Sequence, residues 1–369
     1  MPPNPNPESR IPVLKVVYFL RKLPEMRKLF IGCALLVACG GSPMEPAPSV
    51  VPGVTPSPPS PSPNPGSPIP NPGEGAVRLN DDFGGRQLFP SDNWWNQEIT
   101  NAPVDAQSSA YIDFIGRTSA AHPDFGPPPY GIPFVGVGGT EPRTPVTFVD
   151  YGDESDAGFR GEAGYPIPEA AKTQPNFIEG SVPGGGSDGD RHLLIVDRDK
   201  WALYELFAAG WNASRQRWEA GSGAVFDLSS NARRPEGWTS ADAAGLAILP
   251  GLVRYEEAMR GPIRHALRAT VRRTNNYVWP ASHRAGSTAG ALPMGARLRL
   301  KASKDLSRYP PYIQNMFRAM QTYGLIVADN GGDMYVTGTM DLRWNNSELN
   351  PAFISLTAGD FDVIRLGWR

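Results

Sequence analysis

The sequence predicts a mainly β protein, with one large antiparallel β-sandwich of the jelly-roll kind and a few covering helices. Three observations favour this class. Many short segments alternate apolar and polar residues, which is typical of strands with one buried face. Short polar turns join several of them, which favours antiparallel pairing, although another β fold would fit the same strands nearly as well. Residues 77–369 contain no repeat and no second linker, so we expect a single domain there.

The first 39 residues have the pattern of an export signal. MRK at residue 26 is positively charged, LFIGCALLV is a short apolar run, and small residues lead to Cys39. This pattern resembles a bacterial lipobox. The resemblance implies cleavage before Cys39, a lipid on its sulfur and anchoring of the mature protein to a membrane. Met26 makes a better start than Met1, and the apolar run is too short to span a bilayer.

Residues 40–76 are rich in proline, serine and glycine, and about half of the 40 prolines precede residue 77. Such a segment is too poor in apolar groups to collapse, so we expect a disordered tether between the membrane and the body. Because Gly40 and Gly41 follow the cysteine, the resemblance favours the outer membrane if the cell is Gram-negative. The body would then face the periplasm or the exterior.

The composition excludes several functions. The net charge of −2 gives no argument for nucleic-acid binding. Cys33 would be removed with the signal and Cys39 would carry lipid, so the mature body would contain no thiol for a disulfide, a nucleophile or a metal. The four histidines are widely spaced and show no zinc motif. We therefore expect a monomer without a cofactor, with one calcium alternative described below.

The expected elements follow in chain order. The strand candidates are PVTFVDY, RHLLIVDRD, KWALYELFAA, SRQRWEAGS, AVFDLSS, IRHALRATV, RLRLKAS, LIVADNG and MYVTGTM. PPYIQNMFRAMQTYG predicts a helix that covers a sheet, because its apolar residues recur at helical spacing and Gly324 stops it. A shorter helix is expected after a cap at Thr239 or Ser240 and before the break at Pro250.

The stretch from residue 221 to 283 holds most candidate catalytic residues. Asp227 projects from the strand AVFDLSS, on the face opposite to its apolar residues. Asp242 falls in the first turn of the short predicted helix, where an acid can cap the helix. A catalytic role for this carboxylate remains an open alternative. His265 lies on the apolar face of IRHALRATVRR, and an imidazole there is a half-buried structural group or, in a cleft, a proton carrier.

Two further candidates lie upstream, in GDRHLLIVDRDKWALYELF. Asp190 and His192 stand together before an apolar strand. Glu205 lies on the same face as Leu203 and Phe207, where a carboxylate needs a partner or a function. A cleft acid with a raised pKa and a buried ion pair with an arginine fit the pattern equally well.

Aromatic and basic residues of the same stretch are the candidate substrate-binding groups. They are Trp238, Tyr277, Trp279, His283 and Arg268. Aromatic rings stack on sugar faces, although they also fill sandwich cores.

Three other acidic segments contain candidate functional residues. Asp150, Asp153 and Asp156 in VDYGDESDAG form a calcium loop or a solvated acidic loop. HPDFG brings His122 and Asp124 near aromatic residues. In ADNGGDMYVTG, Asp329 and Asp333 flank what is first of all a hairpin turn.

Several phrases of the body resemble a group of secreted bacterial proteins of lipoprotein type. These phrases are HPDFG, GDRHLLIVD, GWTSADAAG, HALR, YVWPASH and ADNGGD, and the similarity covers nearly the whole body. The resemblance implies that the phrases belong together in one exported domain, and it carries no activity and no assigned catalytic residue.

Two functions from different classes fit these features. The first is a lipid-anchored enzyme that cleaves glycosidic bonds in a polysaccharide, with two carboxylates from Asp227, Asp242 and Glu205 and with His192 or His265 tuning or replacing one of them. A lyase variant would use His265 as base and Tyr277 as acid. The second is a non-catalytic carbohydrate-binding or envelope protein. If the enzyme uses these residues as its site, at least three of Asp227, Asp242, His192 and His265 should converge on one concave surface.

Replacement of Cys39 tests the predicted attachment to a membrane. The Cys39→Ser variant should lose fatty-acid labelling and move from the detergent phase to the aqueous phase, because it lacks the acylated sulfur. Labelling with a fatty-acid analogue and detergent partitioning are the measurements. A variant that is still labelled and still membrane-bound would contradict the lipobox.

Overall fold

β-Strands outnumber helices in the computed structural model, which describes residues 77–369. The coarse prediction of a β-rich protein with few helices is therefore confirmed. The described residues all belong to one compact unit. Cys39 and the predicted tether lie outside this range. Within it, no helix combines the length and the apolar character that crossing a membrane requires.

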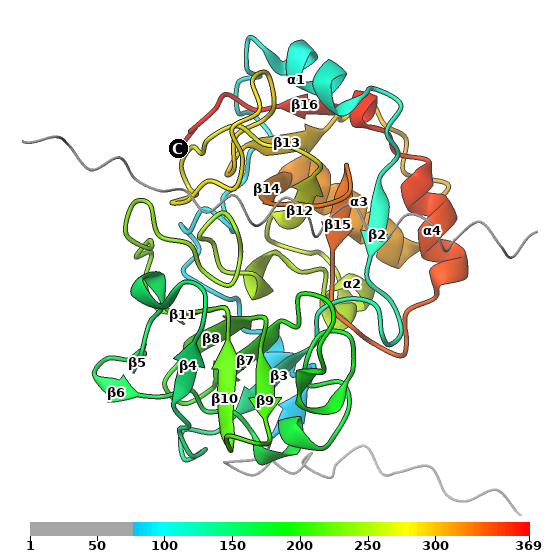
Figure 1. The fold of residues 1–369 in the computed structure, drawn as a ribbon. Helices are drawn as coiled ribbons and strands as arrows, with labels where there is room; N and C mark the ends of the chain where they lie inside the picture. The colour runs from blue at the N-terminus through cyan, green and yellow to red at the C-terminus, as the bar shows by residue number, and fades with distance from the viewer. Residues whose placement is uncertain (1–76) are drawn as a thin grey trace, which may run out of the picture. The chain divides into compact units, whose positions relative to one another are not determined.

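A five-stranded sheet forms the middle layer of the fold (Figure 1). Its order is β1 (Arg78–Leu79), β3 (Phe134–Val137), β7 (Leu193–Asp197), β8 (Ala202–Phe207) and β11 (Ser222–Asp227). β3 and β7 are parallel, and the other neighbours are antiparallel. Both faces of β7 are buried, which explains why LLIVD is an almost continuous apolar run.

A three-stranded sheet covers one face of this middle layer. It contains β4 (Val146–Phe148), β10 (Arg217–Ala220) and β9 (Gly210–Asn212), and a small hairpin of β5 (Gly158–Phe159) and β6 (Glu162–Ala163) lies beside it. Ile195 and Tyr204 of the middle layer share a core with Trp218 of β10. Alternate residues of β7 and β8, such as Leu194 and Leu203, face the opposite side.

A six-stranded mixed sheet forms the upper part of the fold in Figure 1. Its order is β16 (Phe361–Val363), β13 (Arg297–Leu300), β14 (Leu325–Asn330), β12 (Leu267–Val271), β15 (Tyr335–Thr337) and β2 (His122–Asp124). β12 is parallel to β14 and antiparallel to β15, and β15 is parallel to β2.

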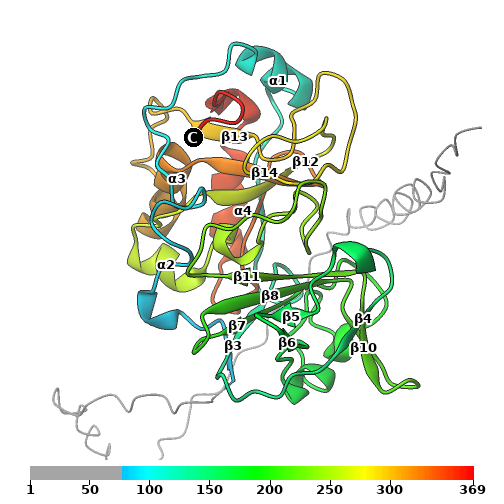
Figure 2. The same ribbon diagram turned by 90° about the vertical axis from the view of Figure 1, so that its left-hand side faces the viewer.

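Helices surround this second sheet (Figure 2). They are α1 (Ser108–Ile115), α2 (Tyr255–Arg260), α3 (Pro311–Thr322) and α4 (Asn346–Ile354). Short 3-10 turns are η2 (Phe83–Gly85), η3 (Gly152–Glu154), η4 (Glu169–Lys172), η5 (Pro183–Gly185), η6 (Leu249–Gly251) and η7 (Ala358–Asp360). The predicted helix PPYIQNMFRAMQTYG is confirmed as α3, which buries Ile313 and Phe317. Gly324 follows it at φ 81°, a conformation that favours glycine.

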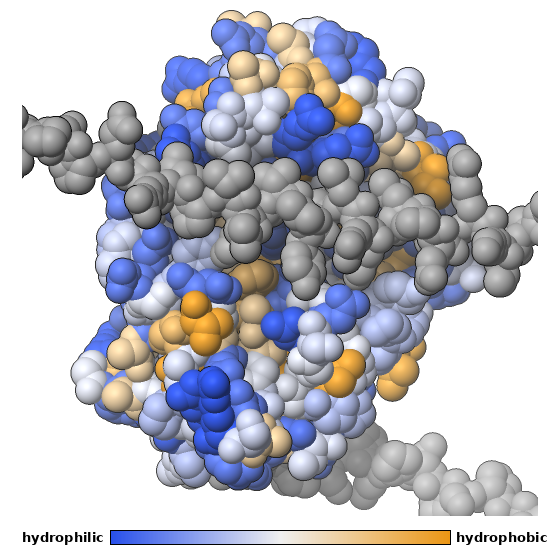
Figure 3. Space-filling view, viewed as in Figure 1, coloured by the Kyte–Doolittle hydropathy of each residue, from blue (hydrophilic) through white to orange (hydrophobic). Residues whose placement is uncertain are grey.

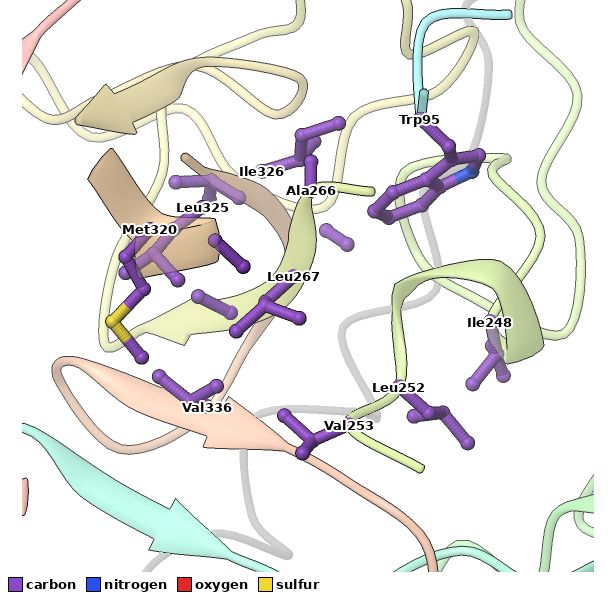
Figure 4. Close-up of a cluster of buried hydrophobic side chains, with 14 of the residues drawn as sticks. Trp95, Ile248, Leu252, Val253, Ala266, Leu267, Met320, Leu325, Ile326 and Val336 are labelled. Atoms are coloured by element: carbon purple, nitrogen blue, oxygen red, sulfur yellow. The ribbon is translucent and has the colours of Figure 1, made fainter. Parts of the chain in front are cut away.

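One large hydrophobic core joins the middle layer to the six-stranded sheet. Figure 4 shows side chains of β12, β14, β15 and α3 meeting Trp95 and the segment around η6. Trp95 is completely buried, and its main-chain carbonyl accepts a hydrogen bond from the Ala266 N–H just before β12. The core therefore fixes both the start of β12 and the η6 turn beside it.

The prediction of antiparallel pairing throughout is wrong, because the sheets are mixed. Four strand pairs, β3–β7, β4–β10, β12–β14 and β2–β15, are parallel. Parallel neighbours require long connections, and β15 pairs with a strand more than 200 residues earlier in the chain. Short polar turns in the sequence reveal only the antiparallel hairpins.

The short helix expected after Thr239 is also wrong. Only the η6 turn forms in this segment. The Ser240 hydroxyl donates to the carbonyls of Asp242 and Leu246 instead of capping a helix, because small polar side chains compete with helical hydrogen bonds. The strand predicted from residue 263 begins at Leu267, so His265 precedes β12.

On the face shown in Figure 3, hydrophobic residues outside the grey band form small groups among hydrophilic ones. Exposed large apolar side chains such as Tyr130 and Leu342 occur in the described part of the chain. Scattered exposed apolar residues are normal and carry no functional argument by themselves.

Replacing Gly251 with alanine tests the packing of η6 against Trp95. An added Cβ would lie 2.6 Å from the indole ring, so the Gly251→Ala variant should lose about 1–3 kcal/mol of unfolding free energy through overpacking. Urea unfolding measures the loss. Gly152→Ala is the matched control, because its Cβ would meet Phe148 at an ordinary 3.8 Å. Equal stability of the two variants would contradict the packing argument.

Candidate functional site

The Arg268 side chain is the centre of a polar cluster between the six-stranded sheet and the loop that follows β11. Its Nε and Nη2 donate to the two carboxylate oxygens of Asp242 at 2.9 and 2.8 Å. Nη1 donates to the Thr337 hydroxyl at 2.8 Å, and Nη2 also lies 3.3 Å from Asp329. Asp242 and Arg268 are both buried. A bidentate pair of this kind fixes the loop on the sheet.

Strand pairing explains how the cluster assembles. Antiparallel β12 and β15 place Ala269 opposite Val336, so Arg268 and Thr337 are neighbours on one face of the sheet. Parallel β15 and β2 place Thr337 opposite Asp124. Asp329 comes from β14, on the other side of β12. Four adjacent strands thus contribute one polar side chain each to the same face.

Two carboxylates compete for the single Arg268 guanidinium. Burial raises the pKa of Asp329 to about 7, the charge of Arg268 opposes this rise, and the negative charge of Asp242 adds to it. Because Asp242 already neutralises Arg268 through two hydrogen bonds, Asp329 is the carboxyl that keeps a proton.

Asp124, on the edge strand β2, is exposed to solvent. Burial by the surrounding protein nevertheless raises its pKa, and the positive charge of Arg268 opposes the rise. The negative charges of Glu179 and Asp190 add to it. Asp124 therefore combines contact with solvent and a raised pKa.

His192 supplies a second buried cation. Its Nδ1 lies 2.7 Å from a Glu179 carboxylate oxygen, and its Nε2 lies 3.2 Å from the Ala241 carbonyl. Both ring nitrogens face acceptors, so both carry protons. Burial alone would lower the pKa of His192, but the Glu179 charge raises it to about 9. The side chain is therefore an imidazolium at neutral pH, unable to act as a general base.

Glu205 is completely buried on β8 and accepts hydrogen bonds from the main-chain N–H groups of Ile248 and Leu249 at 2.8–2.9 Å. Burial raises its pKa to about 7, although the two N–H groups oppose the rise. The bonds hold the start of η6 against the middle layer. Glu205 is thus a positioning group, although Asp242 and His192 are its electrostatic neighbours.

The other two candidate catalytic residues lie elsewhere. Asp227 ends β11, where it pairs with Arg160 at 2.5 Å, and hydrogen bonds with Ser229 and Arg160 lower its pKa against the effect of burial. His265 lines a separate pocket. Its Nδ1 faces the Ala266 carbonyl at 2.8 Å, and its Nε2 lies 2.9 Å from Glu257. The structure therefore brings together only two of the four residues expected to converge, Asp242 and His192.

The predicted substrate-binding residues are also separated. Tyr277 interacts with Glu236, whose hydrogen bond raises the pKa of the phenol. The pair of His265 and Tyr277 considered for a lyase is thus divided between two sites. Trp279 packs edge-on against Trp94, with ring centroids 6.2 Å apart.

The remaining three members of that group have local partners. The Trp238 ring lies below the Arg234 guanidinium at 5.6 Å. His283 Nδ1 lies 2.8 Å from the Ala243 carbonyl. Arg268 is occupied by its ion pair with Asp242, so its role is to organise the cluster.

Sequence analysis did not assign four members of the cluster to a site: Asp124, Glu179, Asp190 and Asp329. The phrases HPDFG, GDRH and ADNGGD had drawn attention to three of them. Glu179 had no signal of its own, since only the fold places it beside His192. Local sequence shows which residues are polar, but strand order decides which of them meet.

No group of three or more histidine, cysteine, aspartate or glutamate residues suited to a metal ion occurs among residues 77–369. In the loop considered for calcium, Asp156 is ion-paired with Arg234 and accepts the Val225 N–H. One of the three carboxylates of this loop is therefore already neutralised.

Comparisons with known proteins give no relative from which a function could be transferred. No family model, no curated protein and no solved structure matches the chain. The chemistry of the cluster therefore has to carry the functional argument.

The pH dependence of stability tests the His192–Glu179 pair. The pKa of His192 is raised from 6.5 to about 9, so its contribution is fully present below pH 6.5 and is lost as pH rises through 9. On the order of 3 kcal/mol of unfolding free energy should disappear across this window.

The Glu179→Gln variant should be less stable at pH 6 and should lack this decline, because its imidazole no longer gains a charged partner. Asp227→Asn is the control, since that carboxylate pairs with Arg160 instead. Urea titrations at several pH values measure both. A decline of the same size in Glu179→Gln would show that His192 does not gain its charge from Glu179.

Proposed function

We propose that this protein cleaves glycosidic bonds in a polysaccharide, using Asp329 as proton donor and Asp124 as the carboxylate that activates water. The observation that carries the proposal is the pair of carboxyls with raised pKa values on one sheet face, arranged around a single guanidinium. Glycosidases require one carboxyl that keeps its proton near neutral pH and a second that is ionised.

The environments of the two carboxyls suit these different tasks. Asp329 is half-buried beside the Asp242–Arg268 pair and keeps its proton up to about pH 7. Asp124 is exposed, so it is the carboxyl that can ionise and meet a water molecule. Next to it, the rings of His122 and Tyr335 contact each other at a tilt of 37°, with centroids 4.4 Å apart. Aromatic side chains beside a carboxyl can pack against the apolar face of a sugar ring.

Strand spacing indicates the stereochemical class. Asp329 and Asp124 stand on β14 and β2, with β12 and β15 between them. Three strand spacings and an offset of two residues along the strands separate their main chains by about 16 Å. Even if both side chains lean inward, about 11 Å remains between the carboxyl groups. Retaining enzymes need about 5 Å and inverting enzymes about 6.5–9.5 Å, so the spacing argues against retention and comes closer to that of inverting enzymes.

The predicted lipid anchor and tether would place this site at the cell envelope, facing the periplasm or the exterior. The five-stranded and three-stranded sheets, with their shared core, are the part that we interpret as a β-sandwich. In this interpretation the six-stranded sheet adds the acid–base cluster beside the sandwich.

A glycan panel tests the proposal. The full-length protein should release reducing ends from at least one polysaccharide, with inverted anomeric configuration by NMR and without unsaturated uronates. The rate should fall as pH rises through about 7, where Asp329 loses its proton, and it should also fall in acid, where Asp124 becomes protonated.

Variants make the assignment specific. Asp329→Asn and Asp124→Asn should each lower kcat by at least about 100-fold while leaving the urea midpoint nearly unchanged. Asp113→Asn is the matched control, because this carboxylate is exposed on α1 and pairs with Arg117. Full activity in both site variants would refute the assignment. Tight glycan binding without any bond cleavage would favour the non-catalytic carbohydrate-binding alternative.

A further inference from the structure

A surface groove lies apart from the acid–base cluster and consists of three adjoining pockets that all share Arg264. Their volumes are about 320, 500 and 360 Å³. Gln87 joins the first pocket to the second, and Tyr323 joins the second to the third. The first pocket is framed by η2 and α2, at the lower left of Figure 2. Three connected pockets fit an extended chain better than one small molecule.

Hydrogen-bonding side chains dominate the middle pocket. Its lining includes Gln87, Ser91, Asn96, Gln97 and Arg264. Sugar hydroxyls both donate and accept hydrogen bonds, so a mixture of amides, carboxylates and a guanidinium can satisfy them. The Tyr323 ring adds a flat apolar surface.

The acids of the first pocket are already neutralised. Asp82 pairs with Arg260 at 2.8 Å, and Glu257 pairs with Arg254 at 2.5 Å. Asp341 pairs with Arg343 at 2.7 Å. The arginines in these three pairs therefore carry no excess positive charge. A positive charge that attracts a ligand must come from other residues.

Arg264 is an unpaired cation at the junction of the three pockets. It is exposed, and within residues 77–369 its guanidinium forms no ion pair or hydrogen bond. Its own main-chain carbonyl accepts a hydrogen bond from Gln87, which fixes the backbone at the junction of the pockets. An exposed guanidinium on a fixed backbone is suited to bidentate binding of a carboxylate.

A second, independent observation points to a negatively charged ligand. Arg297 is buried beneath the middle pocket, where its Nη2 donates to the carbonyls of Trp94, Gln97 and Tyr323. Its Nε and Nη1 have no hydrogen-bond partner among the described residues. Burial lowers its pKa to about 9, so it remains charged at neutral pH. No carboxylate of residues 77–369 compensates this charge, and the field of Arg297 therefore favours an anion above it.

Two carboxylates in the middle pocket limit the kind of anion. Asp92 accepts a hydrogen bond from Asn231 at 2.8 Å, and Glu98 lies 3.4 Å from the Tyr323 hydroxyl. They would repel a densely charged ligand such as a polyphosphate. A sugar chain with spaced carboxylates can place hydroxyls at these acids and a carboxylate at Arg264.

We propose that the groove meeting at Arg264 binds an acidic polysaccharide, with Arg264 pairing with the carboxylate of a uronic acid unit. The inference rests on the proposed function only for the choice of a polysaccharide as ligand. Binding at the groove does not require bond cleavage, so it can be measured in a protein whose acid–base cluster has been disabled.

Titration calorimetry on the full-length Asp329→Asn protein tests the inference with two matched probes, a polygalacturonate oligomer and its methyl ester. The acid should bind at least about tenfold more tightly than the ester, because a charge-assisted pair is lost on esterification. Adding Arg264→Gln should reduce binding of the acid to the level of the ester. Arg264→Lys should give an intermediate affinity, since it keeps the charge and loses the bidentate geometry.

Arg215→Gln is the control, because Arg215 is an exposed arginine that pairs with Glu219 on a distant hairpin. It should leave the affinity unchanged. Equal affinities for acid and ester, unchanged affinity in Arg264→Gln, or no binding of either probe would overturn the inference. Cleavage of a glycan by the wild-type protein with no role for Arg264 would overturn it while leaving the proposed function intact. Binding through Arg264 in a wild-type protein that cleaves no glycan would support the inference and contradict the proposed function.

Discussion

The buried ion pair between Asp242 and Arg268 is the interaction on which the arrangement of this protein depends. Asp242 belongs to the long segment between β11 and β12, and Arg268 belongs to the centre of the six-stranded sheet. Their two hydrogen bonds attach the segment to the sheet. Removing one partner of such a pair leaves an uncompensated buried charge, which typically costs about 3–5 kcal/mol. The same pair determines which nearby carboxyl must keep a proton.

Several buried polar groups of the cluster form hydrogen bonds that stabilise the fold. Glu205 receives two main-chain N–H groups and holds η6 against the middle layer. His192 is held between Glu179 and a carbonyl. Because these groups are satisfied, we interpret Asp124 and Asp329 as the carboxyls of the cluster that remain available for chemistry. Unequal environments around two carboxyls are the usual origin of a general acid and a general base in one site.

The sequence predicted local features well where one short segment decides them. The period of apolar residues in PPYIQNMFRAMQTYG defines α3, and alternation in AVFDLSS locates β11. It failed where distant segments decide the outcome. The HPDFG phrase contains β2, whose partner β15 lies more than 200 residues later. The sequence therefore predicted neither their parallel pairing nor the position of Asp124 beside Thr337. Ser240 and Asp242 looked like a helix start, but contacts with the loop and with Arg268 prevailed.

The candidate site was partly predicted for the same reason. Asp242, His192, Glu205 and Arg268 attracted attention because charged residues in apolar surroundings need partners, and the structure shows those partners. That reasoning finds polar residues that are buried, and buried residues with complete hydrogen bonding are the least able to meet a substrate. The residues with chemical freedom are those at the edge of the cluster, such as Asp124 on the edge strand β2. Burial in the sequence pattern therefore located the neighbourhood of the proposed site, whereas strand order is needed to recognise Asp124 and Asp329, the carboxyls that we propose to react.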